Sequence, residues 1–222
     1  MIKATELIVG YPAFRPFDKL TASPAQGPVG EPCRTTGIAV SGLLSFCFAD
    51  GECVMLRGSN GSGKTTLMKT LAGLLPPISG SFETGGEAIL VPTRIPKVKG
   101  FTVDEFVRTG MLASLGSFKK LDKEAERCFK EALRMMELSN LAGKDISRIS
   151  DGEFQKACIA AALTRKANVL MLDEPTAFLD VENRVMVLQT LQRLAHETST
   201  TVLFSTHDIH DGALYSDSVL AL

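Results

Sequence analysis

The chain has 222 residues, of which 45% are hydrophobic and 22% are charged, as in an ordinary folded protein with one large core. Lys and Arg number 24 against 25 Asp and Glu, so the strong basic field needed for general nucleic-acid binding is absent and we expect no nucleic-acid partner. No stretch approaches the roughly 18 uninterrupted apolar residues that indicate a membrane-spanning helix.

The N-terminal residues, MIKATELIVGY, include Glu6 and lack a long apolar core, so they make a poor secretory signal. The five cysteines are scattered and form no Cys-x-x-Cys pair, which favours reduced thiols in a cytosolic protein. Residues 12–37 hold five prolines and three glycines and predict an irregular loop. Around this loop we expect strands at 2–9, 38–48 and 52–57, then a helix from Lys64 to near Gly73, before Pro76 and Pro77.

The second half alternates strands and helices, which predicts a parallel sheet flanked by helices. In the helical run 121–138, four apolar residues at helical spacing predict one buried face. The apolar residues of this run are Ala125, Phe129, Leu133 and Met136. The expected strands are 88–92, 168–173, 200–205 and 217–222. The expected helices are 102–112, 121–138, 151–165 and 181–197. The chain ends directly after the last predicted strand, so we expect no regulatory tail.

The stretch 95–148 lacks good core strands and is mainly helical. We interpret residues 1–222 as a single domain into which a helical subdomain is inserted, over about 95–165. The fold class predicted from these patterns is α/β.

A glycine-rich segment lies between a predicted apolar strand and a predicted helix, where a phosphate-binding loop of the pattern G-x-x-x-x-G-K-[ST] belongs. Its glycines allow backbone N–H groups to converge on phosphate oxygens, and the helix N-terminus adds positive charge. Lys64 can reach the β and γ phosphates, and the Thr65 hydroxyl can hold Mg²⁺. The segment, hereafter the phosphate loop, is Gly58, Ser59, Asn60, Gly61, Ser62, Gly63, Lys64 and Thr65.

Two acids, Asp173 and Glu174, follow the buried strand run Val169–Leu172. Ligands of parallel sheets lie outside the carboxyl ends of the strands, so these acids belong near the phosphates. We expect Asp173 to hold Mg²⁺ through water and Glu174 to orient or deprotonate the attacking water. The simpler alternative is a pair of strand-end acids that face solvent.

Ser150 followed by Glu153 fits a helix capping box, the simplest interpretation of the segment Ile149–Gln155 (ISDGEFQ). The other motifs of the chain add a second interpretation. The phosphate loop, ISDGEFQ, LMLDEPTAFLD at 170–180 and STHD at 205–208 occur in the order seen in ATP-binding-cassette (ABC) ATPases. The chain therefore resembles a nucleotide-binding subunit of an ABC transporter over nearly its whole length, loop 12–37 excepted.

The resemblance implies a P-loop NTPase fold with an antiparallel N-terminal part, and ATP and Mg²⁺ as cofactors. Lys64, Glu174 and the switch histidine His207 become the catalytic residues, and Thr65 and Asp173 the metal ligands. Tyr11 matches the aromatic residue that stacks on adenine; an ordinary strand-end tyrosine is the alternative, and Phe14 is the fallback. The implied nucleotide contacts are Tyr11, the phosphate loop, Thr66, Ser150 and Gly152 (facing the γ-phosphate held by the opposite subunit), and the D-loop Asp180. His196 and His210 match no motif and are predicted to be surface residues.

Two departures from the family matter. Its signature is usually Leu-Ser-Gly-Gly-Gln, whereas this chain has Ile149-Ser150-Asp151-Gly152-Glu153, a form that resembles importers of iron–siderophore, haem and cobalamin. Thr93 occupies the place of a glutamine that links metal, water and membrane partner. Because Thr93 is shorter and has no amide, hydrolysis or its coupling to transport is expected to be altered.

We expect an ATPase that works as a homodimer or pseudo-dimer and powers import of an iron complex. Its partners would be a separate transmembrane permease, docked on helical segment 95–148, and a periplasmic substrate-binding protein. It would lie in the cytoplasm, on the inner face of the membrane. Three alternatives stay open: a small exporter of haem or lipid type, since residues 56–80 are similar to a haem-exporter ATPase; a DNA-repair or translation-control ABC protein; and a regulatory cassette without turnover.

Overall fold

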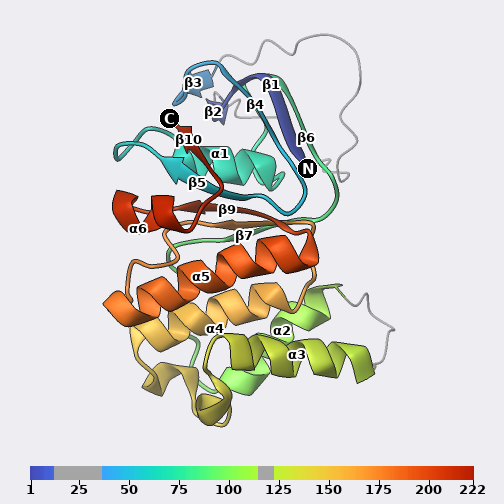
Figure 1. The fold of residues 1–222 in the computed structure, drawn as a ribbon, viewed down its shortest axis with the longest axis vertical. Helices are drawn as coiled ribbons and strands as arrows, with labels where there is room; N and C mark the ends of the chain where they lie inside the picture. Colours follow the sequence, from blue (N-terminus) through green and yellow to red (C-terminus); the bar gives the residue numbers. More distant parts are fainter. Residues whose placement is uncertain (13–36, 115–122) are drawn as a thin grey trace, which may run out of the picture.

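The computed structural model describes residues 1–12, 37–114 and 123–222 (Figure 1). Its centre is a five-stranded parallel sheet in the order β10-β5-β9-β8-β7. A three-stranded antiparallel sheet, β4-β1-β6, and a two-stranded one, β2-β3, lie above it. The strands are β1 (Ile2–Ile8), β2 (Gly10–Pro12), β3 (Gly37–Ala39), β4 (Leu44–Phe48), β5 (Cys53–Arg57), β6 (Ser79–Thr84), β7 (Ala88–Val91), β8 (Val169–Leu172), β9 (Thr201–Ser205) and β10 (Ser218–Ala221).

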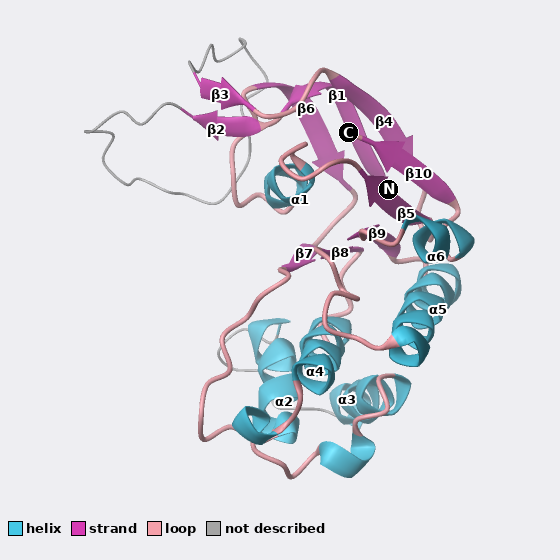
Figure 2. Cartoon of the chain, turned by 90° about the vertical axis from the view of Figure 1, so that its left-hand side faces the viewer, coloured by secondary structure: helices cyan, strands magenta, loops and turns pink. Residues whose placement is uncertain are grey.

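The helices lie on both faces of the parallel sheet (Figure 2). Helix α1 lies between the parallel and antiparallel sheets, and the remaining longer helices lie on the other side. The helices are α1 (Lys64–Leu71), α2 (Val103–Ser114), α3 (Lys123–Met135), α4 (Asp151–Leu163), α5 (Val181–Thr198) and α6 (Ile209–Leu214), with short 3₁₀ turns η1 (Ser139–Leu141) and η2 (Ile146–Arg148). This architecture confirms the predicted α/β class with an antiparallel N-terminal part and a parallel core.

Alternation along the central strands divides the interior into two cores. On β5, Val54 and Leu56 face the core beneath the antiparallel sheet and α1, whereas Cys53 and Met55 face the core with α4 and α5. Every residue of β8 and β9 is buried, because both faces of the sheet are covered. The loops that follow these strands therefore begin at a tightly packed edge of the central sheet.

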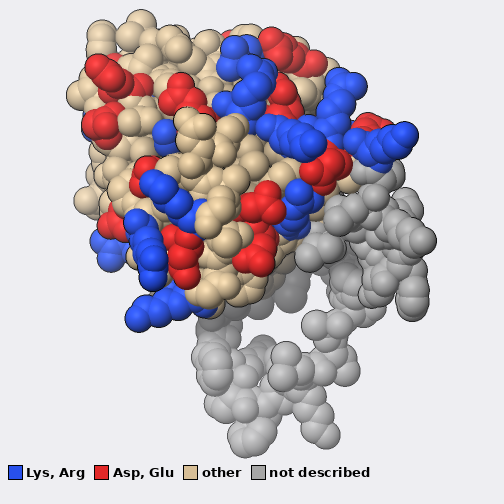
Figure 3. All heavy atoms as spheres, turned by 90° about the horizontal axis from the view of Figure 1, so that it is seen from below, with Lys and Arg blue, Asp and Glu red and all other residues tan. Residues whose placement is uncertain are grey.

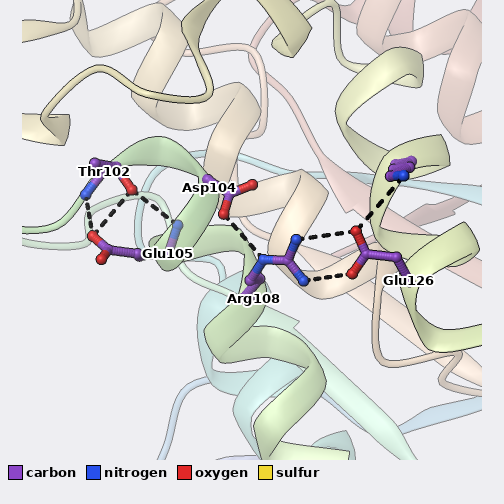
Figure 4. A network of polar contacts seen from close by, with 6 residues as sticks. Thr102, Asp104, Glu105, Arg108 and Glu126 are labelled. Atoms are coloured by element: carbon purple, nitrogen blue, oxygen red, sulfur yellow. Dashed lines mark hydrogen bonds and ion pairs between the residues drawn. The ribbon is translucent and has the colours of Figure 1, made fainter. Parts of the chain in front are cut away.

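Charged side chains join the outer helices α2 and α3 (Figure 4). Arg108 of α2 donates to Asp104 (3.0 Å) and makes two hydrogen bonds to Glu126 of α3 (2.7 and 3.1 Å). Its guanidinium also lies 3.9 Å from the ring centroid of Phe129. The buried face predicted over 121–138 is confirmed at Phe129, Leu133 and Met136, which are buried, whereas Ala125 is only partly buried.

The structure differs from the sequence prediction in three places. Residues 38–48 do not form one strand, because β3 pairs with β2 whereas β4 pairs with β1 in another sheet. Strand β6 was not predicted, since its polar sequence is held by backbone pairing with β1 rather than by an apolar pattern. Helix α6, begun by an Asp208 cap, was missed as well. Of the predicted loop 12–37, residues 13–36, with Phe14, lie outside the described residues.

Within the described ranges, no helix is both long and apolar enough to cross a membrane. The face of the molecule seen from below carries Lys and Arg interleaved with Asp and Glu (Figure 3). His196 and His210 are surface residues as predicted: the His196 side chain is about half exposed beside Asp217, and His210 is exposed.

Candidate nucleotide site

The phosphate loop joins β5 to α1 and is shaped by two left-handed glycines, Gly61 (φ 83°) and Gly63 (φ 99°). A Cβ at Gly58 would lie 2.4 Å from the Ser62 Oγ, so the loop also closes tightly on itself. Gly63 is the N-cap of α1, and no side chain accepts a hydrogen bond from the first-turn amides there. Those amides, including those of Thr65 and Thr66, therefore remain available to an anion.

Lys64 is buried, with its ammonium folded back over the phosphate loop. The Nζ donates to the carbonyl oxygens of Gly58 (2.7 Å) and Ser59 (2.9 Å). The Ser62 hydroxyl is buried and has no hydrogen-bond partner in the described part of the chain. A buried cation and an unsatisfied hydroxyl in one glycine-rich loop fit a bound phosphate, which supplies several acceptor oxygens.

Asp173 lies directly after β8 and binds two hydroxyl groups. Thr65 Oγ1 donates to Asp173 Oδ2 (2.7 Å), and Ser205 Oγ donates to Asp173 Oδ1 (2.8 Å). A carboxylate and a hydroxyl from separate segments are the hard oxygen donors that Mg²⁺ prefers, and this ion takes its other ligands from phosphates and water. The residues present therefore fit Mg²⁺, although no group of three or more His, Cys, Asp or Glu suited to a metal occurs among the described residues.

Glu174 and His207 face each other beside this carboxylate. His207 Nε2 lies 2.7 Å from Glu174 Oε1. Glu174 has φ 52°, a left-handed conformation that is strained for a residue with a side chain and clusters at functional sites. The Ser205 hydroxyl accepts a hydrogen bond from the Glu174 N–H (2.9 Å), which fixes this backbone. A cavity of about 290 Å³, lined in part by Glu174, Thr206 and His207, lies at this place.

The capping box predicted at Ser150 is confirmed. Ser150 Oγ accepts from the Glu153 N–H (3.1 Å), and a Glu153 carboxylate oxygen accepts from the Ser150 N–H (2.7 Å). The hydrogen bond from the Ser150 backbone holds the pKa of Glu153 below its usual value. A Cβ at Gly152 would lie 3.0 Å from the carbonyl oxygen of Phe178, so the start of α4 packs closely against the segment after Glu174.

One chain does not bring the signature segment to its own phosphate loop. Helices α1 and α4 lie on opposite sides of the parallel sheet (Figure 2). In the described residues, the hydrogen bonds of Ser150 join it to Glu153 and Phe154, not to the phosphate loop. A role for Ser150 and Gly152 at a γ-phosphate therefore needs a second subunit.

Asp180 is the N-cap of α5. It accepts from the Asn183 N–H (2.8 Å) and from the Asn183 side chain (2.8 and 3.0 Å), and the backbone hydrogen bond lowers its pKa. Lys156 of α4 donates to Asn183 Oδ1 (2.9 Å), which links α4 to the start of α5. Within one chain, Asp180 is thus a helix cap.

Tyr11 lies on β2, is about half exposed, and pairs with Ile38 of β3. Two residues further along, the Val40 carbonyl oxygen lies 3.1 Å from the position of a Cβ at Gly63, so this β2–β3 ribbon borders the phosphate loop. Thr93 follows β7, whose neighbour β8 leads to Asp173. Thr93 lines a cavity of about 590 Å³ together with Lys97, Asp151 and Phe178.

The sequence prediction missed residues that support the site. Ser205 was quoted only as part of STHD, yet it holds both Asp173 and the Glu174 backbone. A hydroxyl at the end of a buried strand was the available signal. Lys97, which contacts the signature segment, gave no local signal, because its partners lie more than 50 positions away.

A parallel sheet that ends in a phosphate loop, beside a carboxylate suited to Mg²⁺ and a Glu–His pair, defines a nucleotide-hydrolysing P-loop protein. Residues 42–177 match the family model described as ABC transporter. The chain therefore belongs to the ABC transporter family, as an ATP-binding subunit with the ATPase fold.

Two curated relatives and one solved structure extend this finding. The chain is 31% identical to the iron(3+)-hydroxamate import ATP-binding protein FhuC of Bacillus subtilis (strain 168), over 81% of this chain and 71% of the relative. It is 34% identical to the petrobactin import ATP-binding protein FpuC of Bacillus anthracis, over 78% of this chain and 68% of the relative. An inward-facing metal-chelate-type ABC transporter has a similar structure, with a TM-score of 0.80 and 26% identity, over 100% of this chain and 79% of the other.

Proposed function

We propose that this ATPase powers the import of an iron complex of siderophore or haem type through a separate membrane permease. The observation that carries the proposal is the similarity to import ATP-binding proteins for iron hydroxamate and petrobactin. The sequence Ser150-Asp151-Gly152-Glu153 supports the same branch. The chain would lie at the cytoplasmic face of the membrane, with a periplasmic substrate-binding protein delivering the iron complex.

The proposed working unit is a head-to-tail dimer of ATPase subunits. Each ATP would lie between the phosphate loop of one subunit and Ser150–Gly152 of the other, because one chain holds these parts on opposite sides of its sheet. Tyr11 would stack on adenine, which is worth about 1–3 kcal/mol for a base on an aromatic ring. Asp180 would contact the opposite subunit.

The residues at the phosphate end divide the chemistry. Lys64 and the α1 amides bind and orient the phosphates, and Thr65 and Asp173 would hold Mg²⁺, which supplies charge neutralisation when bound. Glu174 would accept a proton from the attacking water or orient it, a role worth about 10²–10⁴ in rate. His207 fixes the Glu174 carboxylate at 2.7 Å and would contact the γ-phosphate.

The permease would dock on the helical side of the chain, into the 590 Å³ cavity beside Thr93. Charges of both signs cover the neighbouring lower face, so docking would depend on specific pairs and shape rather than on one dominant field (Figure 3). Because Thr93 replaces a longer amide side chain, the link between nucleotide and permease would run through other residues of the segment 93–97.

The ATPase and dimer parts of the proposal are tested with purified protein. We expect Mg²⁺-dependent ATP hydrolysis by the wild type, alone or with its permease, and an ATP-trapped dimer for Glu174→Gln in light scattering. The exposed Glu182→Gln provides the matched control and should leave hydrolysis unchanged. A Glu174→Gln protein that stays monomeric with saturating ATP would count against the dimer.

The transport part of the proposal is tested together with a membrane permease that binds this chain. Proteoliposomes with both subunits and the binding protein should take up a ferric hydroxamate or haem only with internal ATP. ATP-dependent movement of haem or lipid in the opposite direction would favour the exporter alternative instead. ATP binding with no turnover in either assembly would favour the regulatory cassette.

A further inference from the structure

Lys97, in the segment after β7, contacts the segment Ile149–Gln155 at three points. Its Nζ donates to the carbonyl oxygen of Ile149 (2.8 Å) and lies 2.7 Å from Asp151 Oδ1. It also lies 5.6 Å from the ring centroid of Phe154. These partners flank Ser150 on both sides, so Lys97 fixes the backbone at the place where α4 begins. With 23% of its side chain exposed, Lys97 is partly shielded from water.

The first turn of α4 carries two acids, Asp151 and Glu153. Acids at a helix N-terminus stabilise the helix, but they reduce its attraction for a phosphate. The Glu153 carboxylate is turned back onto the Ser150 N–H. The Asp151 side chain is 75% exposed, and Lys97 is its ion-pair partner.

We propose that Lys97 is a positioning residue for the ATP-sandwich dimer: it cancels the charge of Asp151 and holds the backbone around Ser150, so that the start of α4 attracts the γ-phosphate held by the opposite subunit. This inference rests on the proposed head-to-tail dimer. Lys97 also lines the cavity beside Thr93, together with Asp151 and Phe154 at the start of α4.

The charge part is tested by ATP-driven dimer formation in the Glu174→Gln background, measured by analytical ultracentrifugation. Lys97→Met should weaken the dimer about tenfold, since two copies of a partly exposed ion pair, each worth roughly threefold to fivefold, act on one dimer. Adding Asp151→Asn to Lys97→Met should restore most of the affinity. Lys130→Met, which removes an exposed lysine 3.9 Å from Glu126 on α3, should stay within about twofold of the parent.

The positioning part is tested without nucleotide by amide hydrogen exchange. Lys97→Met should speed exchange at the amides of residues 150–155, and Lys97→Arg should restore slow exchange because it keeps a donor and the charge. Unchanged exchange in Lys97→Met would overturn the positioning role.

These experiments distinguish failure of the proposed dimer from failure of the role proposed for Lys97. If Glu174→Gln itself stays monomeric with ATP, the proposed head-to-tail dimer is contradicted. The role of Lys97 toward the phosphate of the opposite subunit is then contradicted as well. If Glu174→Gln dimerises but Lys97→Met dimerises equally well, or Asp151→Asn restores nothing, only the charge-cancelling role is overturned. If Lys97→Met does not fold, Lys97→Arg and the single variant Asp151→Asn replace it: each should keep the parent affinity, and a tenfold loss in both would contradict the proposal.

Discussion

The N-termini of helices α1 and α4, the two that we propose to face phosphates, are built differently. At α1 the site is made by the backbone: left-handed glycines leave the amides open, and no acid lies in the first turn. At α4 the amides are capped by Ser150, and two acids occupy the first turn. The amides of the first turn of α1 are open to an anion within a single chain, whereas under the proposed dimer the start of α4 would meet a phosphate only from a second subunit, with Lys97 paired to Asp151.

The two regions also differ in how they are held. Strands β8 and β9 are buried over their whole length, so the residues after them are fixed by the core. Helices α2, α3 and α4 also pack around buried residues such as Val107 and Ile159, and ion pairs such as that of Arg108 with Glu126 add to this packing. Exposed ion pairs are worth little each, so they hold the helices less firmly than burial holds the strands.

The largest effect on activity is expected from removing the positive charge of the phosphate loop. Lys64→Ala should lower the rate of ATP hydrolysis by about 10²–10³-fold, because a preorganised cation at the transferred phosphate is lost. Lys69→Ala, on the last turn of the same helix α1, is the control and should keep near wild-type turnover. Steady-state phosphate release measures both, and a Lys64→Ala protein within about tenfold of the wild type would contradict the assignment.

The helical side should be more sensitive to backbone crowding than to loss of charge. A Cβ at Gly110 of α2 would lie 1.9 Å from the carbonyl oxygen of Ala161 in α4. Gly110→Ala should therefore lower the free energy of unfolding by about 1–3 kcal/mol in urea denaturation. At Gly143 a Cβ meets nothing within 4 Å, and Gly143→Ala should stay within about 0.5 kcal/mol. Equal stability of the two variants would show that α2 and α4 do not pack this closely.

Comparing two capping boxes can separate the structural role of Ser150 from its proposed contact with the nucleotide. Thr102 caps α2 as Ser150 caps α4, with reciprocal bonds to Glu105 (Figure 4). Thr102→Ala and Ser150→Ala should each cost about 1 kcal/mol of unfolding free energy. In ATPase assays, Ser150→Ala alone should lower turnover, by about tenfold, the worth of a hydrogen bond to a charged group.

Ser150→Asp separates the capping role of this residue from its proposed phosphate contact, because Asp is as good an N-cap as Ser but brings a negative charge toward the phosphate. We expect near wild-type thermal stability with reduced turnover. Turnover equal to that of the wild type would leave Ser150 as a cap only.

The smallest effect is expected for the ion pairs between α2 and α3. Arg108→Met should lower the free energy of unfolding by about 0.5–1 kcal/mol at pH 7. Hydrogen bonds from Arg108 hold the pKa of Glu126 below its usual value. The contribution of this ion pair to the free energy of unfolding is therefore fully present above the pKa of an unfolded-state glutamate, about 4.3. It is lost as pH falls through the lower pKa of Glu126 in the folded state. Urea denaturation should show the difference between the two proteins shrinking as pH falls through the lowered pKa of Glu126, and a difference that stays constant with pH would exclude Glu126 as the cause.

Much of the phosphate end was predictable from the sequence because its parts are contiguous. The phosphate loop, Asp173 and Glu174 each follow a buried strand directly, and parallel strands bring their carboxyl ends to one edge of a sheet. Strand β6 could not be predicted, because its edge position is stabilised by backbone pairing with β1 and needs no apolar pattern. The Lys97 contacts with Ile149 and Asp151 join segments more than 50 positions apart.

The sequence by itself determined the chemistry of the nucleotide site and the family, because a phosphate loop depends on a few adjacent residues whose backbone conformation is set locally by glycine. Only the tertiary structure decided that Ser205 holds Asp173 and the Glu174 backbone, that Glu174 is strained and paired with His207, and that Lys97 forms an ion pair with Asp151. These contacts depend on which side chains the sheet and helices bring together, and no local pattern of residues encodes that proximity.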